Sequence, residues 1–284
     1  FNTVRYSEKL LQKHGISVQT IDFSEIIFKA MHYSDAEKVV AKIKEIREYG
    51  SVPAWISDEV MEKQAKLCLV IDETIEDLQC DASTVQCWDS VENNYGCATC
   101  LAMSMMGDNG KPSACESDVT GALSMLAAWL AAGTAPALMD WNNNIREERN
   151  ACVSLHCSNF PKSFFQNDVE IECLDVLGST LGKENCFGAC KGHVAAGDMT
   201  FIRLTTDDQR GTVKAYLGEG VFRDEVIPTK GGVANCYIEN LQNLLRYICE
   251  NGYEHHVCFV RGHVADILEE ALTKYMGIPV YRHR

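Results

Sequence analysis

Met199-Thr-Phe-Ile-Arg-Leu-Thr-Thr-Asp-Asp-Gln-Arg-Gly-Thr-Val-Lys-Ala-Tyr-Leu217 is the stretch that decides the fold of the second half of the chain. Apolar and polar residues alternate through 199–204 and again through 212–217, which predicts two half-buried β-strands. The residues between them, 205–211, include Asp, Gln and Gly and predict a hairpin connection. Further strands are predicted at 135–139, 151–156, 256–260 and 278–281, and helices at 238–251 and 264–275. The second half is therefore predicted to be rich in β-strands.

The first half of the chain alternates between helical patterns and short apolar segments. Helices are predicted at 6–14, 34–49, 57–78 and from about 117 to 132, and strands at 16–21 and 83–88. The second of these helices opens on Ser34 and Glu37, the pattern of a capping box. These elements predict an α/β fold: a Rossmann-like α/β sandwich domain with a mostly parallel sheet over 1–134, then a β-rich, barrel-like domain over 135–284.

Charge and composition narrow the range of partners. The 284 residues include 26 Lys and Arg against 40 Asp and Glu, a formal net charge of -14. Such an acidic chain repels phosphate backbones and anionic lipid surfaces, so neither nucleic acid nor a membrane is an expected partner. No apolar run approaches the ~20 residues that cross a bilayer. The composition predicts a globular protein.

The chain contains 14 cysteines, and their role is open. Several lie inside apolar runs, as Cys68 and Cys249 do, where a thiol behaves as a small core hydrophobe. Reduced thiols and a cytoplasmic location are therefore expected rather than a disulfide framework. A CxxC at 97–100 and a CxxxC at 186–190 leave a structural zinc site as an alternative. The first residue is Phe rather than Met, so the sequence leaves open whether an N-terminal piece precedes it.

Candidate metal ligands stand beside apolar runs. Four segments carry them: Cys115-Glu116-Ser-Asp118, Leu138-Met-Asp140, Leu155-His156 and Glu254-His255-His256. Two carboxylates with one or two imidazoles suit Mn²⁺, Mg²⁺ or another divalent cation. His255 and His256 are expected to point to opposite faces of a strand, so that only one joins a given site.

Each candidate also has a purely structural interpretation. The acids of 116–118 are placed like helix-start acids, and Asp140 before three asparagines resembles a turn acid. His156 fits a hydrogen-bonded core histidine. The residues alone therefore indicate a metal site without naming an enzyme.

Five segments resemble the L-fucose isomerase-like family. They are 114–121, 138–143, 156–159, 215–220 and 240–256. The resemblance covers nearly the whole chain, and L-arabinose isomerase is a more distant relative. Proteins of this family carry a further N-terminal α/β domain, so this chain resembles their middle and C-terminal domains.

The resemblance implies a ketol isomerase that interconverts an aldose and a ketose through an enediolate. The sugar would be L-fucose, L-arabinose or a related aldose, and the cofactor Mn²⁺ or another divalent cation. Carried across residue by residue, the metal ligands are Glu116, Asp140, His156 and His256, with His255 as an alternative. Glu116 and Asp140 would also be the catalytic pair. The family further implies a homo-oligomer, a hexamer, in which a neighbour helps to close the pocket.

Four residues near these ligands are candidates for binding the sugar. They are Trp141, Asn142, Asn143 and Asn159. Trp141 would stack on the sugar ring or pack in the core, and the asparagines would bind hydroxyls or form turns. Two other functions stay open: a non-catalytic sugar-binding or regulatory protein on the same fold, and another metal-assisted carbonyl enzyme such as an epimerase or aldolase.

Overall fold

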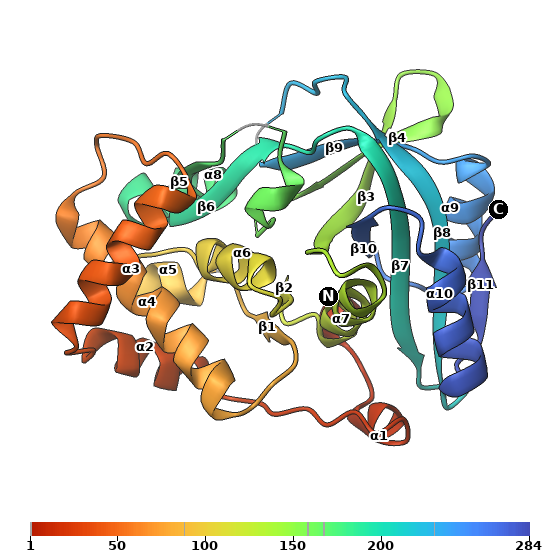
Figure 1. Ribbon diagram of the computed structural model, residues 1–284, viewed down its shortest axis with the longest axis horizontal. Helices are drawn as coiled ribbons and strands as arrows, with labels where there is room; N and C mark the ends of the chain where they lie inside the picture. The colour runs from red at the N-terminus through yellow and green to blue at the C-terminus, as the bar shows by residue number, and fades with distance from the viewer. Residues whose placement is uncertain (1, 88, 158, 167, 230) are drawn as a thin grey trace.

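The computed structural model describes residues 2–87, 89–157, 159–166, 168–229 and 231–284. One large mixed sheet fills the second half of this described chain (Figure 1). Its strands are ordered β11-β8-β7-β10-β3-β4-β9-β6-β5. Their bounds are Ala137–Ile145 (β3), Glu148–His156 (β4), Glu170–Cys173 (β5), Phe187–His193 (β6), Gly197–Asp207 (β7), Thr212–Arg223 (β8), Gly232–Tyr237 (β9), His256–Arg261 (β10) and Val280–Arg282 (β11).

The large sheet curls into a partly closed ring. Strands β8 and β9 pair with one another in addition to their neighbours in the sheet order. Strands β11, β6 and β5 continue the sheet outside this ring. The β-rich second half is confirmed, but the closure is partial, and the sheet mixes antiparallel pairs with the parallel pairs β11–β8 and β6–β9.

The central hairpin is confirmed and is longer than its sequence pattern indicates. Strands β7 and β8 pair from Gly197 opposite Phe222 to Asp207 opposite Thr212. The turn residues sit at the tip, as their polarity predicts. This hairpin places Arg203, the one charged residue of an otherwise apolar stretch, fully inside the protein.

The first half is mainly helical rather than built on a broad parallel sheet. The helices are α1 (Glu8–Gln12), α2 (Phe23–Met31), α3 (Ala36–Tyr49), α4 (Asp58–Asp77), α5 (Ser90–Asn94) and α6 (Cys100–Asp108). Among the described residues the parallel sheet predicted here amounts to two short strands, β1 (Ser83–Val85) and β2 (Ser113–Cys115). Residues 16–21 alternate in polarity but form no strand, and Ile16 and Val18 instead pack against a buried cluster of the second half.

Two helices of the first half begin with a side-chain cap. Ser57 caps α4, which begins where the sequence predicts a helix, and its hydroxyl accepts from the Val60 amide at 3.3 Å. The capping box at Ser34 is wrong by one residue, because the side chain of Asp35 accepts from the Lys38 amide at 3.1 Å. A carboxylate at this position satisfies the same free amide and also suits the helix dipole.

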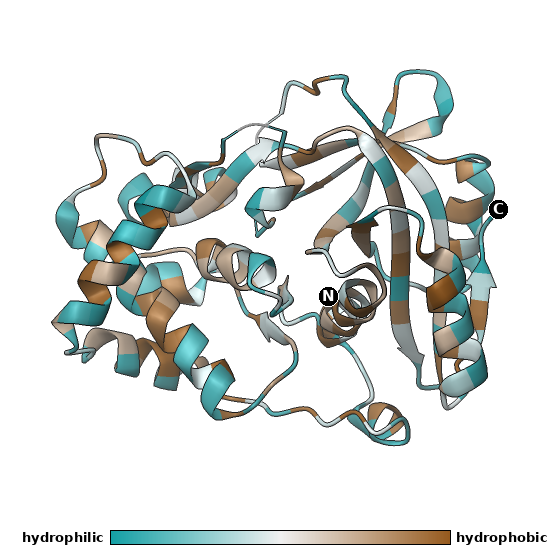
Figure 2. Ribbon diagram, in the orientation of Figure 1, coloured by the Kyte–Doolittle hydropathy of each residue, from teal (hydrophilic) through white to brown (hydrophobic). Residues whose placement is uncertain are grey.

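Helix α7 (Val119–Ala132) lies against the large sheet and ends at Gly133 in the left-handed conformation. Figures 1 and 2 show it as a mostly apolar helix next to β10 and β7. Its Met125 and Ala128 share a buried cluster with Leu138 and Ile202 of the sheet. Helix α7 therefore packs with the second half of the chain, and the division at residue 134 stays a prediction.

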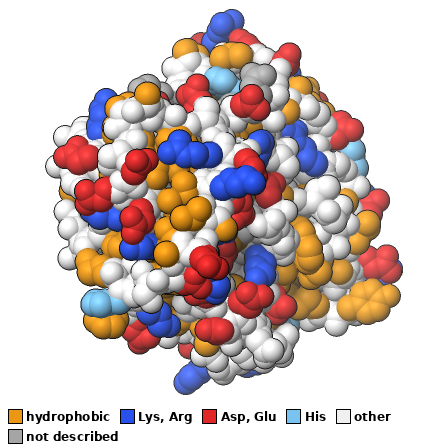
Figure 3. All heavy atoms as spheres, turned by 60° about the vertical axis from the view of Figure 1, so that its left-hand side comes forward, with side chains coloured by type: hydrophobic (Ala, Val, Ile, Leu, Met, Phe, Trp, Pro, Cys, Tyr) orange, Lys and Arg blue, Asp and Glu red, His pale blue; other side chains and the backbone are white. Residues whose placement is uncertain are grey.

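Shorter helices complete the second half: α8 (Asp175–Leu181), α9 (Leu241–Glu250) and α10 (Ala265–Glu270), which continues as a π-helical turn at Ala271–Tyr275. Charged side chains of both signs intersperse with apolar ones on the face that α2, α3 and α4 expose (Figure 3). Lys38 and Lys42 of α3 reach Glu73 and Asp72 of α4 there. In the described part of the chain no helix is both long and apolar enough to cross a membrane.

Candidate metal centre

Three neighbouring strands and one turn bring the predicted ligands to a single place. Strand β10 begins at His256, which pairs with Asp140 of β3, and β3 pairs in turn with β4, which ends at His156. Glu116 comes from the turn between β2 and α7. The four side chains predicted as ligands therefore meet, although 140 positions separate Glu116 from His256.

The Nε2 atom of His256 lies at the centre of this group. It is 3.5 Å from Oε2 of Glu116, 3.4 Å from Oδ1 of Asp140 and 3.3 Å from Nε2 of His156. Neighbouring ligands of an octahedral ion with bonds of about 2.1 Å lie about 3.0 Å apart. The three distances to Nε2 are thus slightly longer than the separation of neighbouring ligands around a small divalent cation.

One carboxylate oxygen supplies an independent test of this fit. Oδ1 of Asp140 is buried and accepts no hydrogen bond among the described residues. Buried polar atoms almost always have a partner, and a carboxylate oxygen without one is suited to a cation. Burial also raises the pKa of Asp140, although the imidazoles of His156 and His256 oppose the rise. The donor set, two carboxylates and two imidazoles, fits Mn²⁺ or a similar ion.

His255 lies closer to this centre than the sequence predicts. Its Nε2 is 3.5 Å from Oδ1 of Asp140, and 51% of its side chain is exposed. Asp140, His255 and His256 each offer a ligand atom within 4.8 Å of the others. The two imidazoles lie near the same carboxylate because β10 begins at His256 and the alternation of a strand does not reach His255. Which of the two binds an ion stays a prediction.

The other ring nitrogen of His256 fixes the orientation of the imidazole. Nδ1 lies 2.8 Å from Oδ2 of Asp118 and donates to this carboxylate when it carries the proton. The lone pair of Nε2 then faces Glu116, Asp140 and His156. Carboxylates that hold metal-binding histidines in this way also strengthen them as ligands.

Asp118 is kept ionised by its own surroundings. It is fully buried and accepts hydrogen bonds from the guanidinium of Arg203 and, at 2.8 Å, from the amide of Gly121. Burial alone would raise the pKa of Asp118, but Arg203 and His256 hold it well below its usual range. The Gly121 amide belongs to the first turn of α7, and the start of a helix also favours an anion.

Arg203 joins Asp118 to a second buried acid. Its Nε lies 3.2 Å from Oε2 of Glu254, whose other oxygen accepts from Thr205 at 2.7 Å. Arg203 also donates to Thr120 at 2.9 Å. Neither Arg203 nor Glu254 was predicted to support the site. The signal was present in the sequence, since an arginine inside the apolar stretch 199–204 needs a buried partner.

Two imidazoles of the site bind a proton readily. Burial acts to lower the pKa of His156, but Cys157 and Asp140 raise it to about 10. For His256 burial again acts downward, and Asp118 and Glu116 raise the pKa. A cation bound to Nε2 takes the place of this proton, so binding releases protons.

The turn that carries Glu116 has an unusual backbone. Glu116 has φ of 61° and Ser117 has φ of 57°, both in the left-handed region. Such a conformation costs about 1–3 kcal/mol for a residue other than glycine. Two successive residues of this kind persist because β2 and α7 hold both ends of the turn, and strain of this sort is concentrated at functional sites.

The predicted sugar-binding residues divide into two groups. The indole of Trp141 donates to the Tyr216 hydroxyl at 2.8 Å and packs edge-on against Phe201 and Phe259, an arrangement that fits the core alternative. Asn159 is buried and donates to the Ser113 carbonyl at 3.1 Å. Its Oδ1 has no hydrogen-bond partner among the described residues.

Asn142 and Asn143 are exposed on β3. The register of β3 against β4 shifts between Trp141 and Asn143, so Asn142 lies in an irregularity of the ladder. Such bulges redirect side chains near functional sites. Oδ1 of Asn143 accepts from the Asn144 amide at 2.9 Å. Sugar binding by these asparagines stays a prediction.

Gly121→Ala is expected to destabilise the protein and to weaken metal binding. A methyl group at this position would collide with the carboxylate of Asp118, and it would approach Nη1 of Arg203 to 3.1 Å. Glycine to alanine within a helix usually stabilises by about 1 kcal/mol, and here overpacking should reverse the sign and cost about 1–3 kcal/mol. Urea unfolding and Mn²⁺ titration measure the two effects. A more stable variant with unchanged metal affinity would contradict this account of Asp118.

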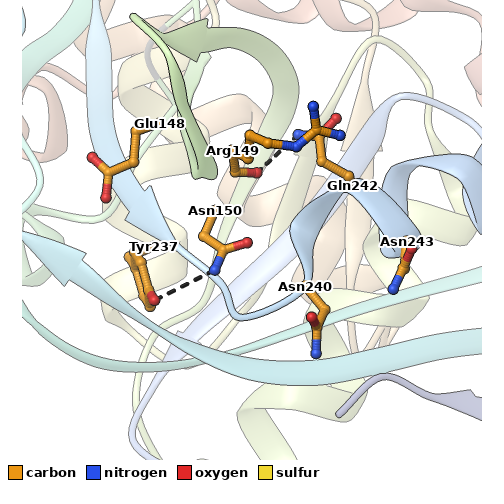
Figure 4. Close-up of a pocket in the computed structure, with 7 residues that line it drawn as sticks. All are labelled: Glu148, Arg149, Asn150, Tyr237, Asn240, Gln242 and Asn243. Atoms are coloured by element: carbon orange, nitrogen blue, oxygen red, sulfur yellow. Dashed lines mark hydrogen bonds between the residues drawn. The ribbon is translucent and has the colours of Figure 1, made fainter.

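A separate polar hollow lies at the other end of β4 (Figure 4). It has a volume of about 510 Å³ and is lined by Glu148, Arg149, Asn150, Tyr237, Asn240, Gln242 and Asn243. In Figure 4 Asn150 points to Tyr237, and Gln242 donates to the Arg149 carbonyl. Asn150 of its lining and His156 lie on the same strand, so about 20 Å of strand separates this hollow from the metal ligands. It takes no part in the candidate centre.

Comparison with known proteins agrees with the family resemblance. Residues 154–284 match the family model of the L-fucose isomerase C-terminal domain. This match includes His156, Arg203 and His256, while Glu116 and Asp140 lie before it. The resemblance to the L-fucose isomerase-like family is thus confirmed, most directly for the C-terminal region.

Relatives extend the similarity over most of the chain. A sulfoquinovose isomerase of Priestia aryabhattai is 27% identical over 274 residues, which cover 95% of this chain and 59% of that protein. A sulfoquinovose isomerase of Alkalicoccus urumqiensis is 25% identical over 270 residues, 94% of this chain and 58% of that protein. A third sulfoquinovose isomerase, from Clostridium sp. (strain MSTE9), is 27% identical over 268 residues, which cover 92% of this chain and 57% of that protein. The chain spans less than two thirds of the length of these relatives.

Proposed function

We propose that the chain is the metal-binding and catalytic part of an aldose–ketose isomerase that acts on a free sugar. One observation carries the proposal: two carboxylates and two imidazoles converge. Glu116, Asp140 and His156 each place a ligand atom within 3.5 Å of Nε2 of His256. The similarity to sulfoquinovose isomerases and to the L-fucose isomerase C-terminal domain supports the same reaction class.

The ion would be Mn²⁺ or another divalent cation, held by Glu116, Asp140, His156 and His256. When bound, it would supply a Lewis acid that polarises the sugar carbonyl and its neighbouring hydroxyl. His255 lies near enough to Asp140 to orient that carboxylate or to contact the sugar.

The proton transfers are assigned to the two carboxylates. One of Glu116 and Asp140 would remove the proton from C2 of the open-chain aldose and return it to C1, through an enediolate. The other would exchange the proton of the sugar oxygen.

The identity of the sugar stays open, and the contacts of Arg203 bear on one candidate. L-Fucose, L-arabinose and related aldoses remain candidates, and the named relatives add sulfoquinovose. Arg203 is committed to Asp118 and Glu254, so it is not placed to bind a sulfonate. A sulfonated sugar would then need a cation other than Arg203.

The full-length protein, stripped of metal, is the material for the test. A panel of aldoses that includes sulfoquinovose, L-fucose and L-arabinose is incubated with and without Mn²⁺, and ketose is measured. We expect ketose from at least one sugar only when Mn²⁺ is present, and in ²H₂O we expect deuterium at C1, because the proton passes through a carboxylate.

Other outcomes would redirect the proposal. An epimer or a cleaved product would indicate another metal-assisted carbonyl enzyme. Sugar affinity without any product would indicate a binding or regulatory protein. Ketose formation that does not depend on a divalent cation would contradict the assigned role of the metal centre.

A further inference from the structure

Four cysteines from four separate segments gather beside the metal centre. Cys87 follows β1, Cys100 begins α6, Cys115 ends β2 and Cys157 follows β4. The sulfur atoms of Cys87, Cys115 and Cys157 all lie within 4.8 Å of one another. Cys100 is fully buried and lies near Cys115 and Cys157, beside the group of three sulfurs. We call these four residues the thiol cluster.

The spacing within the thiol cluster suits a metal ion. The sulfur atoms of Cys115 and Cys157 are 3.7 Å apart. Zinc binds thiolates at about 2.3 Å, which in a tetrahedral site places neighbouring sulfurs about 3.8 Å apart. This pair therefore already has the separation of two zinc ligands, and no backbone movement is needed to create it.

Ordinary core packing accounts for other thiols but less well for these. Cys258 packs among apolar residues of the sheet and donates weakly to a backbone carbonyl. In the thiol cluster, by contrast, sulfur faces sulfur, and the side chains come from two strand ends, a helix start and a loop. The zinc alternative predicted from 97–100 and 186–190 is not this site, because Cys100 faces Cys115 and Cys157 whereas Cys97 lies near Cys68 and Cys186.

We propose that the thiol cluster binds a soft divalent metal ion of the zinc type as a second, mononuclear metal site. On binding, the S–H bonds break, the protons pass to solvent and metal–sulfur bonds form. Thiolates select zinc and similar soft ions, whereas carboxylates with imidazoles accept harder ions such as Mn²⁺. The two adjoining sites would thus bind different ions, because their ligand types differ.

His156 connects the two sites. Its Nδ1 lies 3.3 Å from the sulfur of Cys157, and its Nε2 lies 3.3 Å from Nε2 of His256. A thiolate at Cys157 accepts the Nδ1 proton of His156, and the Nε2 lone pair then faces the carboxylates. The thiol cluster would in this way orient a ligand of the first centre, as second-layer partners of metal-binding histidines do.

Cobalt substitution tests the proposal on the full-length protein, purified under reducing conditions. Tetrahedral cobalt thiolate has intense charge-transfer absorption in the near ultraviolet and strong visible bands. We expect about one Co²⁺ per chain with this signature, and Zn²⁺ should displace it. The signature should disappear in Cys115→Ser and persist in Cys190→Ser, a matched control in which the replaced thiol is equally buried but lies outside the cluster.

The test separates this site from the proposed function. Asp140→Asn should remove the hard-ion site and leave the cobalt thiolate spectrum unchanged. In the unmodified protein, titration with an organomercurial should release the zinc, and this needs no variant that might misfold. Absence of the thiolate spectrum in the wild type, or a spectrum that Cys115→Ser leaves unaltered, would overturn the proposal whether or not the protein isomerises a sugar.

Discussion

Glu116→Gln is expected to lower kcat for ketose formation by about 10²–10⁴-fold, the usual contribution of a positioned acid or base. The amide keeps the shape of the side chain but can neither accept the proton nor offer a charged oxygen to the ion. Mn²⁺ affinity should fall as well, because the Oε2 atom that faces His256 at 3.5 Å loses its charge. Steady-state kinetics and Mn²⁺ titration measure the two effects.

Glu219→Gln is the matched control for this variant. Glu219 is also a partly buried glutamate with a histidine partner, His263 at 3.0 Å, and neither residue contacts the metal centre. The Glu219→Gln variant should retain wild-type kcat and metal affinity. If Glu116→Gln were as active as Glu219→Gln, Glu116 would have no catalytic role and the assignment of the carboxylate pair would be wrong.

Arg203→Met is expected to lower the free energy of unfolding by about 3–5 kcal/mol. Arg203 is fully buried between Asp118 and Glu254, and its removal leaves two buried acids without their cation. The loss follows from this uncompensated charge, since methionine fills much of the same volume. Urea unfolding near neutral pH measures it.

A surface arginine supplies the control. Arg223 binds Glu148 at 2.8 Å, but both side chains are partly exposed. Arg223→Met should therefore change stability by less than about 1 kcal/mol. Equal effects of the two substitutions would contradict the structural role given to the buried network.

The same network predicts that the free energy of unfolding decreases at acid pH. The pKa of Asp118 is depressed in the folded protein, so its ionisation stabilises the fold above the pKa of the unfolded chain, about 3.9. This contribution is lost as the pH falls through the depressed folded value. The difference between wild type and Arg203→Met should accordingly shrink below about pH 4.

Elements with strong local patterns could be predicted from the sequence. The alternation of 199–204 and 212–217 identified the β7–β8 hairpin, and Ser57 marked the start of α4. The strand predicted at 16–21 failed because a strand also depends on a neighbour, which local alternation does not reveal. The broad parallel sheet failed for the same reason, since the helices of the first half pack mostly on each other.

The candidate site was only partly accessible to sequence reasoning. Family resemblance supplied Glu116, Asp140, His156 and His256, with His255 as an alternative, and the structure brings these side chains together. The supporting network could not be read from spacing, because Arg203 reaches across 85 positions to Asp118 and 51 to Glu254. Contacts at such separations depend on sheet register and not on any local pattern.

Anomalous diffraction from crystals of the full-length protein grown with Mn²⁺ tests the central claim most directly. We predict a manganese peak bounded by Glu116, Asp140, His156 and His256, next to the buried Oδ1 of Asp140. The peak should be absent from Asp140→Asn crystals grown in the same way. Manganese bound elsewhere, or no peak among these side chains in an active preparation, would contradict the account.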